Sequence, residues 1–197
     1  RKVSLDIGRV HYDFTRFCGT TGSDPREGYA WIPANGDLRE NDKCVFVGAA
    51  GPMGVMHTMR AVTSGVPGLS VVGTDLSDER LANLTKVVGP TAEKNGVPLD
   101  IVNTSSTPLE YGYTYATCLV PVPALVSQAV DLLAEGGILN AFAGIPAGTF
   151  GDFDLQGIIE RQIFMLGTSG SDVSDMRTVL RKLEAGIIDT PISLWAI

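Results

Sequence analysis

The sequence has little of what marks a disulfide-rich, secreted or membrane-spanning protein. Its 197 residues include three widely spaced cysteines, Cys18, Cys44 and Cys118, and no Cys-x-x-Cys pair. This pattern argues against a disulfide framework and a cysteine-rich zinc site, and it is typical of a reducing compartment such as the cytoplasm. No apolar run approaches the roughly 20 residues of a membrane span, and the N-terminus shows no secretory leader pattern. We therefore expect no membrane partner.

Basic charge is also scarce. Lys and Arg number 15 against 22 Asp and Glu, so the formal net charge is −7, and no stretch gathers the basic residues. This balance argues against a nucleic-acid or anionic membrane surface, and it leaves a small molecule as the expected partner.

Motifs for several catalytic classes are missing. The sequence has no Gly-x-Ser-x-Gly turn and no Gly-Lys-Ser/Thr phosphate loop, which removes support for hydrolases and nucleotide triphosphatases. The Tyr-x-x-x-Lys pair of short-chain dehydrogenases is absent, and His11 and His57 have no companion residues for a metal site. No residue is assigned a catalytic or metal-binding role.

What is present is an alternation of strand-like and helix-like segments. Apolar runs predict strands at residues 44–47, 71–75, 99–103, 115–120, 138–143 and 163–166. Amphipathic stretches predict helices at residues 52–64, 77–88, 124–134 and 173–185, and residues 91–96 extend or follow the second of these. This order predicts an α/β fold with a doubly wound parallel sheet of Rossmann type. We assign residues 41–197 to this domain and residues 1–40 to an N-terminal strand and helix segment.

A glycine-rich turn joins the first predicted strand to the first helix. A diphosphate needs a turn without obstructing side chains, exposed backbone N–H groups and the positive end of a helix. Gly51 permits close approach of the backbone, Gly54 permits close packing of helix on sheet, and the N–H groups near Pro52, Met53 and Gly54 are expected to bind the diphosphate. Ala49 stands where the dinucleotide fingerprint usually has its first glycine.

A carboxylate follows at the expected spacing. Asp75 lies 24 residues after Gly51, at the end of the second predicted strand, where it can accept hydrogen bonds from the adenosine ribose. Its charge repels a 2′-phosphate, so NAD(H) is favoured and NADP(H) stays possible, since Ser77 and Arg80 are close in sequence. We include Leu76 and Arg80 in this candidate site.

Three further strand ends belong to the predicted site. In an open parallel sheet the ligand lies across the carboxyl ends of the strands. Val120 and Pro121, Gly144 and Ile145, and Thr168 are therefore expected to border the adenine or the nicotinamide.

These motifs together resemble the zinc-type medium-chain alcohol dehydrogenase superfamily. The resemblance covers roughly residues 40–197 and rests on residues 47–54, 73–81, 132–137 and 142–146. Within the superfamily it is nearest to the sorbitol dehydrogenase-like and L-sorbose 1-phosphate reductase members. It implies hydride transfer between a nicotinamide and an alcohol or ketone of a polyol or sugar substrate. It also implies a separate domain with the catalytic zinc, absent from this chain, and a full-length homo-oligomer paired through sheet edges.

The chain begins with Arg1 and ends on the apolar run 192–197, which resembles a strand or buried segment. We therefore expect a piece of a longer enzyme, inactive by itself. Two other functions remain open. One is a methyltransferase that uses S-adenosylmethionine, which also places an acidic residue after a second strand. The other is a non-catalytic nucleotide-sensing domain.

Two short segments of the sequence resemble each other, and the resemblance has two explanations. Residues 18–24 (CGTTGSD) parallel residues 166–172 (LGTSGSD), and Asp6 parallels Asp154 at the same offset. Either two strand-to-helix turns use similar Gly, Thr and Asp chemistry, or an element is duplicated. In the second case residues 1–40 form the tail of an earlier half-domain.

Overall fold

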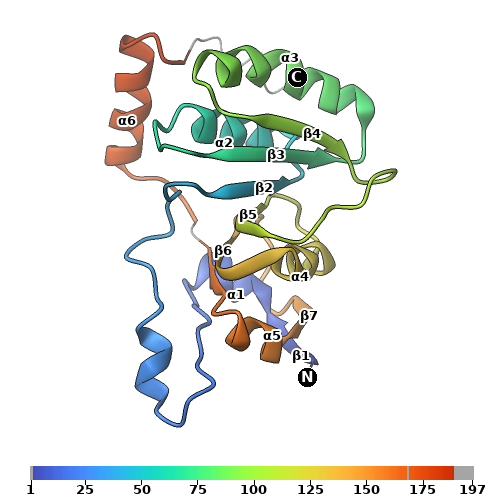
Figure 1. The fold of residues 1–197 in the computed structure, drawn as a ribbon, viewed down its shortest axis with the longest axis vertical. Helices are drawn as coiled ribbons and strands as arrows, with labels where there is room; N and C mark the ends of the chain where they lie inside the picture. The colour runs from blue at the N-terminus through green and yellow to red at the C-terminus, as the bar shows by residue number, and fades with distance from the viewer. Residues whose placement is uncertain (1, 168, 189–197) are drawn as a thin grey trace.

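The computed structural model describes residues 2–167 and 169–188, and a six-stranded parallel sheet forms its centre (Figure 1). The order of the strands in the sheet is β4-β3-β2-β5-β6-β8, so the order reverses between β2 and β5. Their bounds are β2 (Lys43–Val47), β3 (Ser70–Asp75), β4 (Leu99–Asn103), β5 (Tyr113–Cys118), β6 (Leu133–Ala141) and β8 (Phe164–Leu166). Ligands of such sheets bind where the order reverses.

Helices cover both faces of this sheet. On one face α2 (Pro52–Val62) and α3 (Asp78–Lys94) pack against alternate residues such as Phe46 and Val71. On the other face α4 (Pro123–Asp131) packs against a second cluster that includes Val45. The predicted doubly wound α/β class is therefore confirmed, and the strands are buried on both faces as parallel strands usually are.

A second, smaller sheet packs against α4. It pairs β1 (Lys2–Asp6) with β7 (Phe150–Asp154) in antiparallel register, and each strand leads directly into a short helix. These helices are α1 (Ile7–Tyr12) and α5 (Leu155–Glu160). The chain after α1 runs outward through a 3₁₀ helix, η1 (Pro25–Tyr29), before it enters β2 (Figure 1).

The last described helix, α6 (Val173–Glu184), stands apart from the others at one side of the sheet (Figure 1). It has no buried residue, although its sequence is amphipathic. Its first turn is closed by a capping box between Asp172 and Asp175, and near its other end Lys182 donates a hydrogen bond to the hydroxyl of Thr63.

Several predicted boundaries are wrong. The helix expected to reach residue 134 ends at Asp131, because Leu133 already pairs with Tyr113 of β5. Gly136 therefore lies within β6, at a positive φ of 69°, and its N–H donates to the carbonyl of Arg161. The strand expected at 115–120 is β5 at 113–118, and β6 ends at 141 rather than 143. In the other direction, α3 continues through Pro90 to residue 94.

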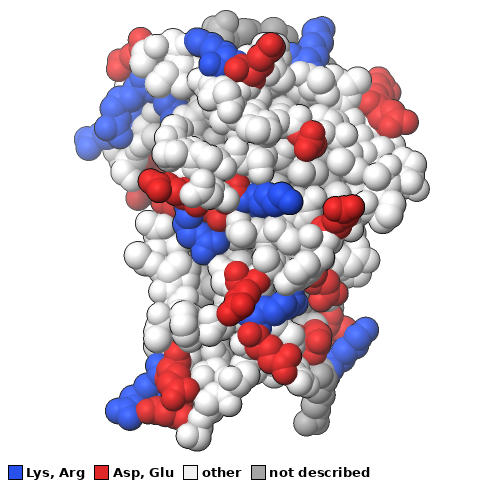
Figure 2. Space-filling model, in the orientation of Figure 1, with Lys and Arg blue, Asp and Glu red and all other residues white. Residues whose placement is uncertain are grey.

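Some expectations lie outside the described residues, namely Thr168 and the run 192–197. Within the described part, no helix has both the length and the apolar character to cross a membrane. On the face drawn in Figure 2, Lys and Arg side chains are interspersed with Asp and Glu.

Candidate functional site

The glycine-rich turn after β2 is fixed by hydrogen bonds to the neighbouring strand. Gly48, at a positive φ of 82°, and Ala49 both donate their N–H groups to the carbonyl of Thr74, at 3.0 and 2.8 Å. Gly51 follows in extended conformation as the N-cap of α2, and Pro52 occupies the first turn, where its missing N–H costs nothing. The turn and the end of β3 are thus held as one unit.

The helix approaches this turn so closely that Gly54 has no room for a side chain. A Cβ there would overlap the carbonyl oxygens of Gly48 and Ala49. At Gly51, in contrast, the nearest atom to a Cβ would be 3.7 Å away, so space is open in front of its backbone. Among the described residues, no acceptor lies against the N–H groups of Met53 and Gly54. The start of α2 therefore offers the open cradle and unpaired donors that a diphosphate requires.

Asp75 lies at the end of β3 beside this cradle and is 6% exposed. Its Oδ1 accepts hydrogen bonds from the N–H of Leu76 (2.8 Å), the N–H of Ser77 (3.2 Å) and the guanidinium of Arg80 (2.6 Å). All three bonds end on Oδ1, and no donor from residues 2–167 or 169–188 bonds to Oδ2, which is left for a further donor. The side chain of Leu76 is 67% exposed and gives an apolar surface next to the carboxylate.

Val120 and Pro121 follow β5 on the other side of the turn. The side chain of Val120 packs against the glycine-rich turn, because a Cβ at Gly48 would overlap its Cγ2. Pro121 is exposed. The structure therefore brings the predicted residues of β2, α2, β3 and β5 together at one edge of the sheet.

The end of β6 is arranged differently from the prediction in one respect. Gly144 is exposed at the sheet edge, but the side chain of Ile145 is 1% exposed and belongs to the core. Only the backbone of Ile145 can therefore border a ligand.

Helix α1 adds residues that were not part of the predicted site. A Cβ at Gly144 would lie 2.9 Å from the hydroxyl oxygen of Tyr12, and the ring of His11 lies with its Nδ1 3.3 Å from the carbonyl oxygen of Ala141. Gly167 packs equally closely, because a Cβ there would be 2.9 Å from atoms of Val10 and His11. Helix α1 therefore covers the ends of β6 and β8. No local signal in the sequence indicates this contact, since it joins segments about 130 residues apart.

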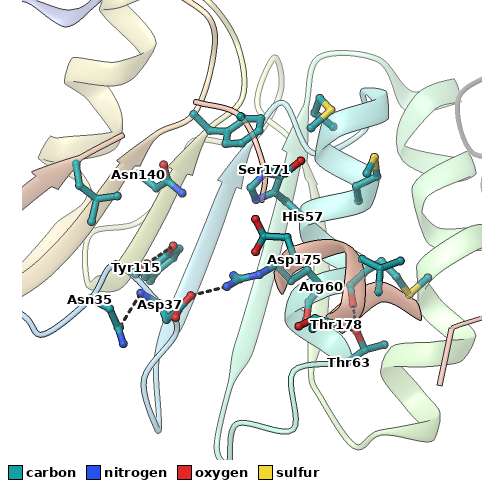
Figure 3. A pocket seen from close by; sticks show the side chains of 18 of the residues that line it. Asn35, Asp37, His57, Arg60, Thr63, Tyr115, Asn140, Ser171, Asp175 and Thr178 are labelled. Carbon is teal, nitrogen blue, oxygen red and sulfur yellow. Dashed lines mark hydrogen bonds and ion pairs between the residues drawn. The ribbon is translucent and has the colours of Figure 1, made fainter. Parts of the chain in front are cut away.

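A cavity of about 750 Å³ opens next to this end of the sheet (Figure 3). Its walls come from α2, β6, β8, α6 and residues 33–37, and they include Met53, His57, Arg60, Asn140, Phe142 and Asp175. Met53 is shared with the predicted cofactor site, whereas Asp75 and Arg80 do not line the cavity. The cavity therefore meets the predicted site at the start of α2, since Val120, Gly144 and Ile145 do not line it either.

Two polar side chains in the cavity wall are notable. Burial, with a smaller contribution from the positive charge of Arg60, lowers the pKa of His57 to about 4, so this imidazole is neutral at pH 7. Its ring packs against Phe142, with 4.3 Å between the ring centroids. Asn140 is 9% exposed, and its Oδ1 has no hydrogen-bond partner among the residues that the structure describes. Arg60 is held by an ion pair with Asp37 (2.5 Å) on the opposite wall.

The thiols and acidic groups of the described segments do not form a metal site. No group of three or more His, Cys, Asp or Glu in residues 2–167 and 169–188 has the geometry to hold an ion. Burial raises the pKa of Cys44 to about 12 and that of Cys118 to about 11, so both thiols stay protonated. What the arrangement offers is binding of a ligand with a diphosphate and a ribose.

Two curated proteins resemble part of the sequence. The chain is 32% identical over 155 residues to the uncharacterized protein YggP of Escherichia coli (strain K12), which covers 73% of this chain and 36% of that protein. It is 28% identical over 151 residues to mannitol-1-phosphate 5-dehydrogenase of Aliivibrio fischeri, which covers 71% of this chain and 36% of the relative. The chain thus spans about a third of the length of both relatives. No family model matches the chain.

Solved structures share the fold. A short chain alcohol dehydrogenase (rspB) of Escherichia coli CFT073, in complex with NADH, superimposes with a TM-score of 0.57 at 24% identity. The match covers 81% of this chain and 45% of the dehydrogenase. Other structures with this fold are alcohol and zinc-binding dehydrogenases, one of them bound to NADP. The likeness establishes a Rossmann-type fold of the kind found in these dehydrogenases.

Proposed function

We propose that this chain binds a nicotinamide dinucleotide and forms the cofactor-binding part of a polyol or sugar-phosphate dehydrogenase. The proposal rests on the hydrogen bonds that join the glycine-rich turn to Thr74 at the end of β3. Its carbonyl accepts both N–H groups of the glycine-rich turn, and Asp75 is the next residue, so the anion cradle and the ribose acceptor are held side by side. A dinucleotide needs these two groups at the same edge of the sheet.

Each part of the cofactor has a counterpart in the chain. The N–H groups of Met53 and Gly54 would hold the diphosphate, and Oδ2 of Asp75 would accept a hydrogen bond from the adenosine ribose. Leu76 and Arg80 would border the adenine, and Val120 and Gly144 would border the nicotinamide. When bound, the cofactor supplies the hydride acceptor or donor, and the protein supplies binding and orientation.

The charges at the ribose favour NAD(H). A carboxylate at Asp75 repels the 2′-phosphate of NADP(H), and the guanidinium of Arg80 offsets part of this repulsion because it is paired with the same carboxylate. Similar structures contain NADH, NAD and NADP, so the fold accepts both cofactor types. We therefore propose a preference for NAD(H) in which NADP(H) also binds.

The substrate class comes from the relatives and the resemblance. Mannitol-1-phosphate 5-dehydrogenase is named for action on a sugar-alcohol phosphate, and the motifs resemble those of sorbitol dehydrogenase-like enzymes. In such an enzyme a second domain supplies the catalytic zinc, and the described residues of this chain offer no ligand set in its place. We propose that the chain binds the cofactor but does not turn over substrate by itself.

Calorimetric titration with NADH, NADPH and S-adenosylmethionine tests this function. We expect saturable NADH binding, weaker NADPH binding and no heat with S-adenosylmethionine beyond dilution. Binding of S-adenosylmethionine without a response to either dinucleotide would overturn the proposal in favour of a methyltransferase. Binding of adenosine nucleotides with no contribution from the nicotinamide half would instead indicate a nucleotide-sensing domain.

A further inference from the structure

The sequence similarity between residues 18–24 and 166–172 is part of a structural repeat. Strand β1 spans residues 2–6 and β7 spans 150–154, and helix α1 spans 7–12 and α5 spans 155–160. Both ends of both elements differ by the same 148 residues. The repeat therefore extends beyond the two similar loops to a complete strand and helix.

Smaller features recur at the same offset. Phe14 and Gln162, which follow the two helices, are non-glycine residues at positive φ, 54° and 55°. Asp24 and Asp172 each begin a helix as its N-cap, and both side chains accept from backbone N–H groups of that helix. Since backbone conformations that L-residues rarely adopt recur in step, residues 2–24 form a second copy of the unit at 150–172.

The two copies face each other across a local two-fold axis. In the β1–β7 ladder Ser4 is the partner of Asp152, and these two residues occupy equivalent positions in the two copies. Phe17 and Met165 form an antiparallel bridge and are also equivalent. Contact between equivalent residues at two separate places is the signature of a two-fold interface, in which a surface binds a second copy of itself.

We propose that residues 2–24 occupy in cis the place that the 150–172 unit of a second copy of this chain would take. The contact between residues 2–24 and 150–172 within one chain then corresponds to the contact that two chains would make in a homodimer. This proposal is independent of the cofactor assignment, because it rests on the pairing of β1 with β7 and of Phe17 with Met165.

The N-terminal copy fits the site better than a second chain would. In a symmetric dimer, Asp152 would face Asp152 of the other molecule on the two-fold axis, and like charges directly opposite each other are destabilising. Ser4 removes this repulsion in the single chain. Gly8 adds close packing, since any Cβ there would overlap the carbonyl of Pro146.

The N-terminal copy also closes the edge of the large sheet. Strand β8 is the last strand of that sheet, and Phe17 bridges to its middle residue, Met165. An exposed edge strand is a template for pairing with another chain. The cis copy therefore prevents dimerisation through this edge, and the edge-to-edge homo-oligomer implied by the resemblance would have to use another surface.

A disulfide across the two-fold axis tests the cis arrangement in the full chain. Opposite residues in an antiparallel ladder have Cα atoms about 4.5 to 5.5 Å apart, within the range that a disulfide spans. We would introduce Ser4→Cys with Asp152→Cys, in a chain whose exposed Cys18 is replaced by Ser. Oxidation at low micromolar concentration is expected to give an intrachain disulfide and a monomer on a non-reducing gel. A disulfide-linked dimer, or two free thiols, would overturn the proposal.

Discussion

The two ends of the proposed cofactor site are built in different ways. The adenosine and diphosphate end lies within residues 43–80, where the turn, Asp75 and Arg80 are joined by short-range hydrogen bonds. The nicotinamide end is assembled from α1, the segment after β5 and the end of β6, which are distant in sequence. The first end depends on one βαβ unit, and the second depends on how α1 docks. We therefore expect substitutions at the first end to change affinity directly, and changes at the second to act through local packing.

The largest effect is expected at Gly54. Gly54→Ala places a methyl group against the backbone of the glycine-rich turn, and backbone cannot move aside as a flexible side chain can. NADH affinity measured by calorimetry should fall by more than about 100-fold, which corresponds to roughly 3 kcal/mol. Gly89→Ala, on the open side of α3, is the control and should bind normally. An unchanged affinity for Gly54→Ala would show that close packing of the turn is not needed.

In the cavity wall beside the start of α2, the corresponding large effect is on stability and depends on pH. The pKa of His57 is lowered to about 4 in the folded chain, against about 6.5 when unfolded. Between these values only the unfolded state binds the proton, so the stabilisation is complete above pH 6.5 and is lost as the pH falls toward 4. The free energy of unfolding should fall by up to about 3 kcal/mol more than in His57→Gln over this range. Parallel urea denaturation curves at each pH measure this difference, and equal pH dependence in both proteins would contradict it.

An intermediate effect is expected at Asp75. Asp75→Ala removes the ribose acceptor and should weaken NADH binding by about 1 to 3 kcal/mol, while the discrimination against NADPH becomes smaller. Glu79→Ala, which removes an exposed carboxylate four residues later, is the matched control. Calorimetry with both cofactors distinguishes the two variants. If both bind NADH equally, Asp75 is not the ribose ligand.

The smallest effect is expected at Gly144. In Gly144→Ala the new methyl group meets only the hydroxyl end of Tyr12, a side chain that is 48% exposed and free to swing away. NADH affinity should change by less than about 1 kcal/mol. Tyr12→Phe, which removes the tyrosine hydroxyl, is then made in the Gly144→Ala protein. It should not alter the small change in NADH affinity. A loss as large as that of Gly54→Ala would mean that the two ends are built alike.

The difference between the two ends of the site also explains which of its parts can be predicted from the sequence. The βαβ unit is predictable because glycine spacing, helix start and Asp75 lie close together in the chain, and the structure places all of them at one edge. The burial of Ile145 was missed because the chain turns inward directly after Gly144. The contact of α1 with Ala141 is not predictable from the sequence, because it joins two segments 130 residues apart that no local pattern links.

Hydrogen exchange with and without saturating NADH tests the central claim most directly. If the dinucleotide binds across the carboxyl edge of the sheet, backbone amides of residues 48–56 and 74–80 should exchange more slowly with NADH present. Residues 2–6 and 150–154, in the small sheet away from the cofactor, should be unaffected. Binding of NADH without protection in either of the first two ranges would contradict the account.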